Sequence, residues 1–558
     1  MTKSRTYSCR GRNSFSLLFV FLILVLAFTA GSAQADTFTV DSTYDDVDDS
    51  VDGLACYSAL AGGCTLRAAI QEANFLAGDD IIMLSEGTYA LSIGQLDINS
   101  NITIIGADNL SNTTDEGSII DGNALDRVIL VSSGTVNISK VTITNGNTAG
   151  FGGGIFNSGS LILSESTIND NASIFGAGIA NNIASSMTLT NVTISGNTAS
   201  GSAAGGIYNA GSMLITNVTI AENDAIAGSG GGIYTDVGAD TTLKNTILDN
   251  NTSASDGNCG GGGTFISNGY NISSDATCVF LIKTGDWNST DPLLDALADN
   301  GGATYTHALL AGSPAIDTGT MLGAPATDQR GVLRPQDGDG NETAVCDIGA
   351  FETGVLVFTP NGGELLEGGT AYTIQWTAPP GALYFTVRYS LNNGLKWKRL
   401  VKKTMGTSYS WVTPWPKKGS YTECLIKITA YSLYDGKKIS EDISDSTFEI
   451  KSVDITSLEG GETVIPGGLG DPLRIEWDVY NTFDSVVSST LSYSIRECGK
   501  KPKWILITEL PGGMRSYNWA LPGIAEDALC ARVRIMLKGY RGKKLTIDMT
   551  PEFVIDAP

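Results

Sequence analysis

Few residues in this 558-residue chain have the chemistry of a catalyst. His307 is the single histidine; it could serve as a general base, but in the phrase THALLAGSP we expect it to be a polar packing residue. A galacturonan hydrolase needs paired carboxylates and a basic substrate clamp, and a polysaccharide lyase needs an Arg or Lys base with a cation. Between Arg127 and Lys283 the only basic residues are Lys140 and Lys244, which lie far apart. We therefore expect no catalytic residues.

One acidic segment could bind a metal ion. Asp337, Asp339 and Asn341 alternate with other residues, as in the first half of a calcium-binding loop. Ile348 occupies the place of the bidentate Glu that such a loop needs. Calcium binding and a plain glycine-rich turn both stay open here, so a metal site is unknown and no other cofactor is expected. A second acidic run, at 45–49, is interpreted as a solvated loop.

The strongest pattern is a repeat between Ile155 and Asn250. Four related phrases follow one another: GGIFNSGSLILSESTINDN, AGIANNIASSMTLTNVTISGN, GGIYNAGSMLITNVTIAEN and GGIYTDVGADTTLKNTILDN. Their period of about 26 residues is typical of a solenoid. Two sets of isoleucines recur at this period: Ile168, Ile194, Ile220 and Ile247, and Ile155, Ile179, Ile207 and Ile233.

The repeats predict a parallel β-helix. Each contains two short β-branched stretches separated by Gly, Asn and Ser, with no helical pattern between them. We expect the isoleucines to stack inside, the asparagines to stack at corners and the glycines to form bends. These asparagines are Asn171, Asn197, Asn223 and Asn250, and the glycines are Gly154, Gly178, Gly206 and Gly232. The Asn-x-Thr triplets at Asn191 and Asn217 could accept glycans, but their recurrence at the coil period favours ladder geometry.

Residues 1–35 have the features of a secretory signal peptide. Basic residues come first, an apolar run extends from Leu17 to Phe28, and the small-residue triplet Ala33-Gln34-Ala35 marks a cleavage site. The run is too short to span a bilayer, and no second apolar stretch of spanning length follows. We expect a secreted or cell-surface protein that begins at Asp36 and has no integral membrane span.

The cysteines agree with export. Cys9 leaves with the signal peptide, and the even number that remains suggests disulfides in an oxidising compartment. The sequence has no CxxC pair, which argues against zinc. The favoured local pairs are Cys56 with Cys64, Cys259 with Cys278, and Cys498 with Cys530.

Charge is distributed unevenly along the chain. The formal net charge is −24. Residues 36–353 contain 7 Lys and Arg against 37 Asp and Glu, whereas residues 354–558 contain 24 against 22. Such an acidic surface repels phosphate backbones, so nucleic acid is not an expected partner.

Several units are expected after the signal peptide. An N-terminal cap with the first coils covers 36–100, and the β-helix covers 101–353. In the cap, Thr65 can act as N-cap of an amphipathic helix that covers the open first coil. The apolar positions of this helix are Leu66, Ala69, Ile70 and Ala73.

The C-terminal part is itself duplicated. Residues 354–452 and 453–558 share aligned phrases: YTIQW with LRIEW, YSW with YNW, and CLIKI with CARVRI. Each copy has about the length and alternation of an immunoglobulin-like β-sandwich. We expect its tryptophans to pack in the core rather than to stack on sugars.

Two segments resemble a known family. Cys64-Thr65-Leu66-Arg67-Ala68-Ala69 resembles the Cys-Ser-Leu-Arg-Glu-Ala motif of exported bacterial β-helix proteins, with Ala in place of the Glu. Downstream, NGGATYTHALLAGSPAIDTG, TDQRGVLRP and CDIGAFE resemble the choice-of-anchor Q domain of the same proteins. The resemblance implies an all-β, right-handed parallel β-helix of the pectin-lyase-like kind, exported to the cell surface. The sequence has no LPxTG signal, and the GGIYN phrases also resemble those of polymorphic outer-membrane adhesins.

These patterns favour one class of function over another. The leading hypothesis is a non-catalytic secreted or cell-surface protein that acts in adhesion or binds carbohydrate or another envelope component. The alternative is an extracellular polysaccharide lyase or glycoside hydrolase. The sequence does not define the ligand or the oligomeric state.

Overall fold

The computed structural model describes residues 35–555, except 52–54, 108–116, 340, 342, 380–381, 433–435, 458–462, 465–471, 481–485, 497–500, 521–528 and 551–552. The predicted signal peptide therefore lies outside the described residues, apart from Ala35. The described part is nearly all β-structure, with one α-helix, α1 (Leu66–Phe75), and one short 3₁₀ turn (Tyr540–Gly542). None of its helices is long and apolar enough to cross a membrane.

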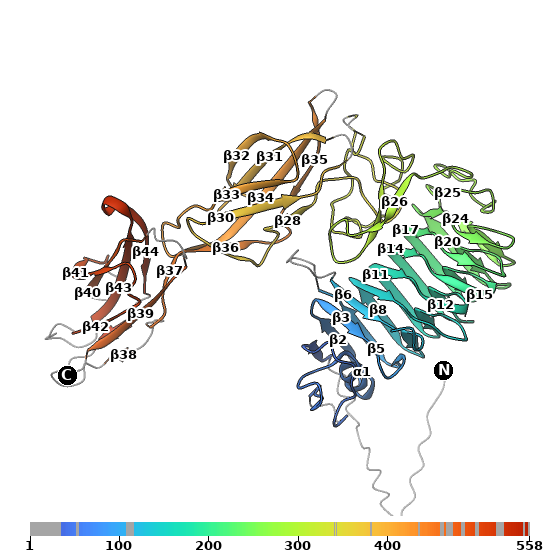
Figure 1. Ribbon diagram of the computed structural model, residues 1–558, viewed down its shortest axis with the longest axis horizontal. Coiled ribbons are helices and arrows are strands. Elements are labelled where there is room, and N and C mark those ends of the chain that lie inside the picture. The colour runs from blue at the N-terminus through green and yellow to red at the C-terminus, as the bar shows by residue number, and fades with distance from the viewer. Residues whose placement is uncertain are drawn as a thin grey trace, which may run out of the picture.

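The N-terminal half is a parallel β-helix of about seven turns, as the repeats predict (Figure 1). Three parallel sheets form its faces, and each strand pairs with the equivalent strand of the next coil. The largest sheet contains β1 (Thr37–Val40), β2 (Asp79–Leu84), β5 (Asn101–Ile105), β8 (Thr135–Ser139), β11 (Ser160–Asn169), β14 (Ser186–Ser195), β17 (Ser212–Ala221), β20 (Asp240–Lys244) and β24 (Thr264–Ser267), together with β3 (Gly87–Ala90), β6 (Ser118–Asp121), β9 (Val141–Thr144), β21 (Ile247–Asp249) and β25 (Ile272–Ser273).

Two smaller sheets complete the coil. The first contains β4 (Leu96–Ile98), β7 (Ile129–Val131), β10 (Ile155–Asn157), β13 (Ile179–Asn181), β16 (Ile207–Asn209), β19 (Ile233–Thr235) and β23 (Cys259–Gly261). The second contains β12 (Ala172–Phe175), β15 (Thr198–Ala203), β18 (Asp224–Ala225) and β22 (Thr252–Ser253).

Aliphatic rows fill the interior of the solenoid. The row Ile155, Ile179, Ile207 and Ile233 is confirmed, because these residues are in register and fully buried. The second row is confirmed from Ile168 to Ile220 but then continues through Leu248, so the prediction for Ile247 is wrong. Ile247 pairs with Thr219 and belongs to a separate apolar cluster.

The asparagine ladder is confirmed with one correction. The side-chain amide of each member donates to the next: Asn171 to Asn197 at 3.0 Å, Asn197 to Asn223 at 2.8 Å, and Asn223 to Asn251 at 2.8 Å. Asn250 is exposed and has a φ of 48°, so it does not belong to the ladder. The reason is that the spacing between ladder members rises from 26 to 28 residues at this coil.

The predicted glycines do lie in bends of the coils, but a left-handed backbone is not the reason for glycine there. Gly178 and Gly206 are absent from the positive-φ glycines of the chain, so their backbones do not require glycine. Instead, a Cβ on Gly178 would lie 2.8 Å from the carbonyl oxygen of Gly206, and one on Gly206 would lie 2.5 Å from that of Gly232. These glycines therefore allow close approach of neighbouring coils.

Helix α1 caps the first coil, as predicted. The Thr65 hydroxyl accepts a hydrogen bond from the Ala68 amide at 3.1 Å, and the apolar face joins the solenoid core. Arg67 binds Asp45 with an Nε–Oδ1 distance of 2.6 Å. The prediction of a solvated acidic loop at 45–49 is confirmed only in part: Val47 and Asp49 are exposed, but the buried Asp45 carboxylate is paired with Arg67 and the buried Asp48 accepts the Tyr57 amide at 2.9 Å.

Two of the predicted disulfides are confirmed, Cys56–Cys64 and Cys259–Cys278. Cys530 is also disulfide-bonded, but its predicted partner Cys498 lies outside the described residues.

Two antiparallel β-sandwiches follow the solenoid (Figure 1). In the first, a three-stranded sheet of β28 (Val357–Thr359), β30 (Ala371–Trp376) and β33 (Ser408–Val412) packs on a six-stranded sheet of β29 (Leu365–Glu367), β31 (Ala382–Ser390), β32 (Trp397–Thr404), β34 (Ser420–Ser432), β35 (Lys438–Ile443) and β36 (Phe448–Lys451).

The second sandwich repeats this strand order, as the duplication predicts. Its sheets contain β37 (Val453–Ile455), β39 (Leu473–Val479) and β42 (Ser516–Trp519), and β38 (Thr463–Val464), β40 (Ser488–Arg496), β41 (Ile505–Pro511), β43 (Leu529–Lys538), β44 (Lys544–Met549) and β45 (Phe553–Ile555). Equivalent tryptophans lie in the two cores, Trp376 and Trp411 in one, Trp477 and Trp519 in the other.

Candidate functional site

Residues 294–353 follow the last coils and fold back along one flank of the solenoid; we call them the clasp. β26 (Leu294–Ala298) and β27 (Thr306–Leu309) pair antiparallel within it, next to the solenoid strands (Figure 1). The clasp contains His307, the calcium-like segment and the phrases TDQRGVLRP and CDIGAFE. Most residues that the sequence singles out for chemistry therefore lie in one module.

The clasp contacts the solenoid at corners of the coils where the backbone is in the left-handed region. Asn191, Asn217 and Asn245 occupy equivalent places and have φ values of 52°, 52° and 46°. Asn191 donates to the Thr327 carbonyl at 2.8 Å, and Asn245 donates to the Thr320 carbonyl at 2.8 Å. Asparagine tolerates this backbone region, which explains its recurrence here. The Asn-x-Thr triplets at Asn191 and Asn217 are thus buried contacts with the clasp.

A row of threonines beside these corners extends the contact. Thr167, Thr193 and Thr219 are in register on β11, β14 and β17. Gln329 of TDQRGVLRP accepts the Thr193 hydroxyl at 2.7 Å and donates to the Thr167 hydroxyl at 3.0 Å. The Ala350 amide donates to Thr219 at 3.1 Å. The threonines of successive repeats therefore form a row of hydroxyl groups that hydrogen-bond to the clasp.

Both arginines of this phrase are buried in ion pairs. Arg330 binds Asp328 with an Nη2–Oδ2 distance of 2.7 Å, and its guanidinium lies 3.5 Å from the centre of the Phe351 ring. Arg334 binds Glu352 at 2.5 Å, with both side chains fully buried. Neither guanidinium is free to bind an acidic substrate.

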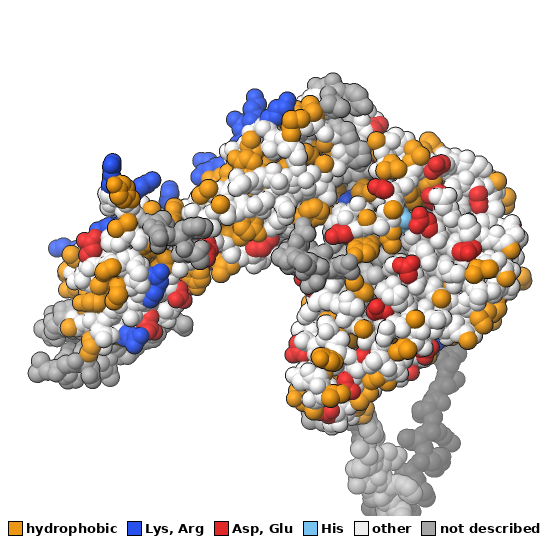
Figure 2. Space-filling model, in the orientation of Figure 1, with side chains coloured by type: hydrophobic (Ala, Val, Ile, Leu, Met, Phe, Trp, Pro, Cys, Tyr) orange, Lys and Arg blue, Asp and Glu red, His pale blue; other side chains and the backbone are white. Residues whose placement is uncertain are grey.

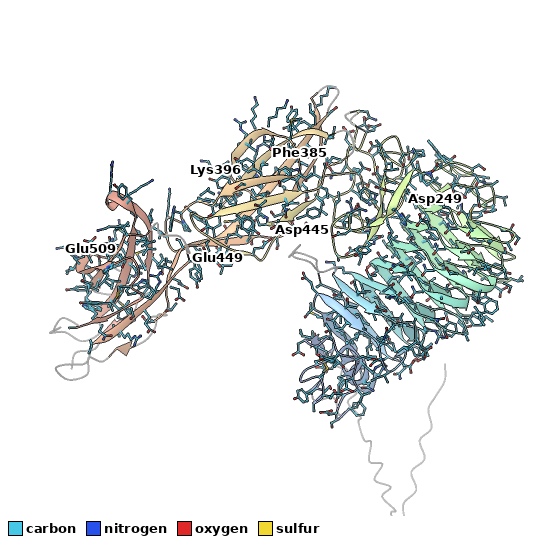
Figure 3. All side chains as sticks on the ribbon, viewed as in Figure 1. Asp249, Phe385, Lys396, Asp445, Glu449 and Glu509 are labelled. Carbon is cyan, nitrogen blue, oxygen red and sulfur yellow. A yellow bond between two sulfur atoms is a disulfide. The ribbon has the colours of Figure 1, made fainter. Side chains whose placement is uncertain are left out.

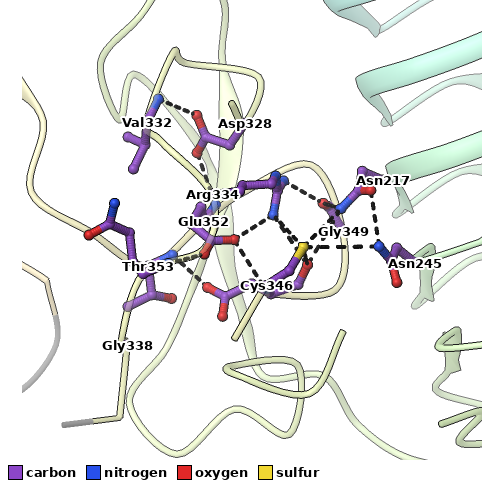
Figure 4. A network of polar contacts seen from close by, with 12 residues as sticks. Asn217, Asn245, Asp328, Val332, Arg334, Gly338, Cys346, Gly349, Glu352 and Thr353 are labelled. Atoms are coloured by element: carbon purple, nitrogen blue, oxygen red, sulfur yellow. Dashed lines mark hydrogen bonds and ion pairs between the residues drawn. The ribbon is translucent and has the colours of Figure 1, made fainter. Parts of the chain in front are cut away.

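Figure 4 shows the network around Arg334. Its guanidinium also donates to the Gly349 carbonyl at 3.0 Å, while Glu352 accepts the Asp347 amide at 2.9 Å. Burial raises the pKa of Glu352 to about 8, and the nearby Asp347 carboxyl adds to the rise while Arg334 opposes it. Burial likewise raises the pKa of Asp347 to about 6. The Arg334 guanidinium thus bonds to the Glu352 carboxyl and to the Gly349 and Asp347 carbonyls, which ties these segments of the clasp together.

His307 lies between the clasp and the solenoid. Its Nε2 is 2.9 Å from the Ser195 hydroxyl, and its Nδ1 is 2.7 Å from the Asp295 carbonyl oxygen. With Nδ1 protonated, the ring donates to Asp295 and accepts from Ser195, the order found in a serine hydrolase. However, Ser195 and His307 are each only 2% exposed, so a substrate cannot reach the hydroxyl. The imidazole thus links β14 of the solenoid to β26 of the clasp.

In the folded protein the Asp317 carboxylate joins the calcium-like segment, which the spacing of residues in the sequence did not predict. Ligand oxygens of Asp317, Asp337 and Asp339 lie within 4.8 Å of one another. Asp317 already accepts the Gly338 amide at 3.3 Å and the Asp339 amide at 2.8 Å. Burial raises its pKa to about 7, and the Asp347 and Asp339 carboxyls add to the rise. The three carboxyls form an oxygen-rich cluster of the kind that hard cations prefer.

A hollow of about 400 Å³ lies where the solenoid, the clasp and the first sandwich meet. Lys140, Glu165, Arg330 and Asp445 are among its lining residues, so its lining contains both cations and carboxylates. Lys244, the other basic residue of the coils, instead donates to the Leu322 carbonyl of the clasp. Lys140 and Lys244 therefore do not lie in a common site.

Comparison with known proteins adds little on function. No family model and no curated protein matches the chain. Among solved structures, it is similar to a chain titled "Structures of Clostridium thermocellum CbhA fibronectin(III)-like modules", at 16% identity, over 36% of this chain and 94% of that chain, with a TM-score of 0.14. A similarity at this TM-score does not bear on function.

Sequence reasoning missed the partners of these residues. Ser195 and His307 are separated by 112 positions, and Asn217 and Gly349 by 132. The repeated Asn-x-Thr triplets were the available signal, because their polar side chains on one flank required a partner. Asp317 had no comparable signal in the sequence.

Proposed function

We propose that this chain is an exported, non-catalytic binding protein of the bacterial cell surface or its surroundings, and that it acts in adhesion to carbohydrate or another envelope component. The observation that carries this proposal is the fate of the chemically capable side chains. His307, Arg330, Arg334 and Glu352 are each less than 9% exposed, and all are bonded to the protein itself. Because these side chains hold the clasp on the solenoid, they are not available for catalysis, and we interpret the protein as a rigid binding scaffold.

Several sequence features support export. The apolar run and Ala33-Gln34-Ala35 fit a signal peptide, and disulfides such as Cys56–Cys64 and Cys259–Cys278 are typical of oxidising compartments. The CTLRAA, TDQRGVLRP and CDIGAFE phrases resemble those of exported β-helix surface proteins with a choice-of-anchor Q domain. The paired sandwiches fit immunoglobulin-like modules that present such a solenoid.

The alternative function is cleavage of an extracellular polysaccharide. The junction hollow favours it, because Glu165 and Asp445 lie among its lining residues together with Lys140. Paired carboxyls are the groups that a glycoside hydrolase uses. This hollow is the place where an activity would be sought.

Incubation of the mature protein with a panel of neutral and acidic glycans separates the two functions. Retention of a glycan without new reducing ends or unsaturated uronates supports the binding role. Release of either product overturns it in favour of an enzyme, and substitution of Glu165 by Gln should then abolish the release. Failure to retain any glycan or envelope fraction removes the binding role as well.

A further inference from the structure

We infer that the first sandwich binds an anionic polysaccharide, in a hollow beside its edge strand β32. This inference rests on the proposed function and deepens it, because it names a ligand class and a place. The hollow measures about 240 Å³ and is lined by Tyr389, Leu391, Asn392, Lys396, Lys398, Lys417 and Tyr421. Three lysines and two tyrosines line it, and its lining contains no carboxylate. This composition suits a sugar ring that bears a carboxylate or sulfate.

The floor of the hollow is held in place by the core. The Tyr389 ring lies 5.3 Å from the ring of the buried Trp411. The side-chain oxygen of Asn392 accepts the Ser390 hydroxyl at 3.0 Å and the Lys396 amide at 3.0 Å. A floor that is ordered before binding loses little conformational entropy when a ligand arrives.

The hollow is also lined by exposed positive charge. Lys396, Lys398 and Lys417 are exposed, and the Lys398 ammonium lies 5.6 Å from the centre of the Tyr389 ring. Lysine side chains of this kind place their ammonium groups in water, where they can meet an anionic group. The hollow thus combines aromatic surface with three cations.

The positive charge continues along β32 beyond the hollow. Lys398, Arg399, Lys402 and Lys403 are all exposed on this edge strand. At about 3.3 Å per residue, they cover roughly 17 Å. Figure 2 shows Lys and Arg side chains gathered over the outer edge of the first sandwich, whereas Asp and Glu are scattered over the solenoid. An extended chain can therefore make several contacts at once.

The second sandwich shows that this charge is not a general requirement of the fold. Edge strands commonly carry lysine because it prevents strand addition by other chains. The equivalent edge strand, β41, follows Trp504 as β32 begins at Trp397, yet it lacks the basic row. The positions of Lys398, Arg399, Lys402 and Lys403 are occupied by Ile505, Leu506, Glu509 and Leu510. Figure 3 labels Lys396 on the first sandwich and Glu509 on the second.

The size of the hollow favours a polysaccharide over other anionic partners. A volume of about 240 Å³ admits one sugar ring but not a folded surface, so the acidic coils of a second copy could meet only the rim. A nucleic acid duplex is a rigid rod of closely spaced charge, and it too could meet only the rim of a hollow of this size. A polysaccharide with one anionic group per sugar fits both the hollow and the strand.

The test uses the full-length mature protein and polygalacturonate, with neutral dextran as the uncharged probe. The hollow variant combines Lys396→Gln, Lys398→Gln and Lys417→Gln. The matched control combines Lys501→Gln, Lys503→Gln and Lys543→Gln, which removes three exposed cations from the second sandwich. Dissociation constants are measured by calorimetry at about 0.15 M NaCl, and thermal unfolding shows that both variants fold.

We expect polygalacturonate binding to weaken about tenfold in the hollow variant, or about 1.4 kcal/mol, since three exposed ion pairs with the ligand are lost. The control should bind as the wild type does, dextran should not bind, and added salt should weaken binding. Equal binding by the hollow variant and the wild type overturns the site but leaves the proposed function intact. If the wild type binds neither polygalacturonate nor any other glycan or envelope fraction, the proposed function fails as well.

Two further measurements address other occupants. Tighter binding of single-stranded DNA than of polygalacturonate, with the same dependence on the three lysines, would overturn the assignment to a polysaccharide. Light scattering at low salt would do the same if it showed self-association that the hollow variant abolishes. Monomeric protein together with weak DNA binding supports the assignment.

Discussion

The substitution Asn197→Ala tests the polar ladder of the solenoid. The Asn197 amide nitrogen donates to the Asn223 side chain at 2.8 Å and to the carbonyls of Ile168 and Ser195 at 3.0 and 3.1 Å. Its oxygen accepts the Asn171 backbone amide at 3.0 Å. Alanine leaves this amide and two carbonyls without their side-chain partner, in a place that water does not reach. The Ser195 carbonyl still accepts the Asp170 amide at 3.3 Å, so two buried groups lose their partner at about 1–3 kcal/mol each, and we expect a loss of about 2–6 kcal/mol.

Hydrogen exchange read by mass spectrometry is the suitable assay, because the chain has several cores and its unfolding need not be two-state. Exchange should accelerate in coils between 157 and 225 and stay unchanged in the sandwiches. Asn182→Ala is the matched control, since Asn182 is half-buried and its amide nitrogen makes one contact of 3.2 Å with Ser158. We expect a loss below about 1 kcal/mol for this control. Equal losses for the two variants would refute the ladder argument.

Three other predictions concern the clasp and the sandwich core. Arg334→Leu leaves the buried Glu352 carboxyl and the Gly349 and Asp347 carbonyls without their guanidinium partner and should cost about 3–5 kcal/mol, seen as rapid exchange across the clasp; protection equal to wild type would contradict this. Burial raises the pKa of Asp442 to about 7, above its usual 3.8, so its ionisation destabilises the fold as pH rises from about 4 to 7. Asp442→Asn should therefore stabilise the first sandwich at pH 8 by up to about 4 kcal/mol and have little effect at pH 4, as pH-dependent unfolding would show; an equal effect at both pH values would exclude this cause. Burial raises the pKa of Cys346 to about 11 and of Cys424 to about 12, so neither thiol should react with a disulfide reagent until the protein unfolds; prompt labelling of the native protein would show that one of them is accessible.

The fold was predictable because its main signal is periodic. Residues that recur at a constant spacing stack at a constant place, so the rows through Ile155 and Asn171 followed from counting. Counting failed where the coil length changed. The spacing of 28 residues between Asn223 and Asn251 moved both rows by one position, from Ile247 to Leu248 and from Asn250 to Asn251.

The candidate site was less predictable because its contacts join distant segments. The sequence singled out His307, and Arg334 lay in a phrase noted only for its family resemblance, but only the folded clasp shows that Ser195 and Glu352 are their partners. The prediction for the acidic run at 45–49 failed in part for the same reason. Its charge suggests solvent exposure in isolation, whereas Arg67 from helix α1 reaches back to Asp45.

The length distribution of a bound glycan tests the central claim most directly, namely that the capable side chains of this protein hold the scaffold together and do no chemistry. Polygalacturonate would be held on the full-length protein for hours, released with salt and sized by chromatography with light scattering. We predict that the polymer is retained and recovered at its original length. Recovery of shortened chains, with a rate proportional to protein concentration, would contradict the account.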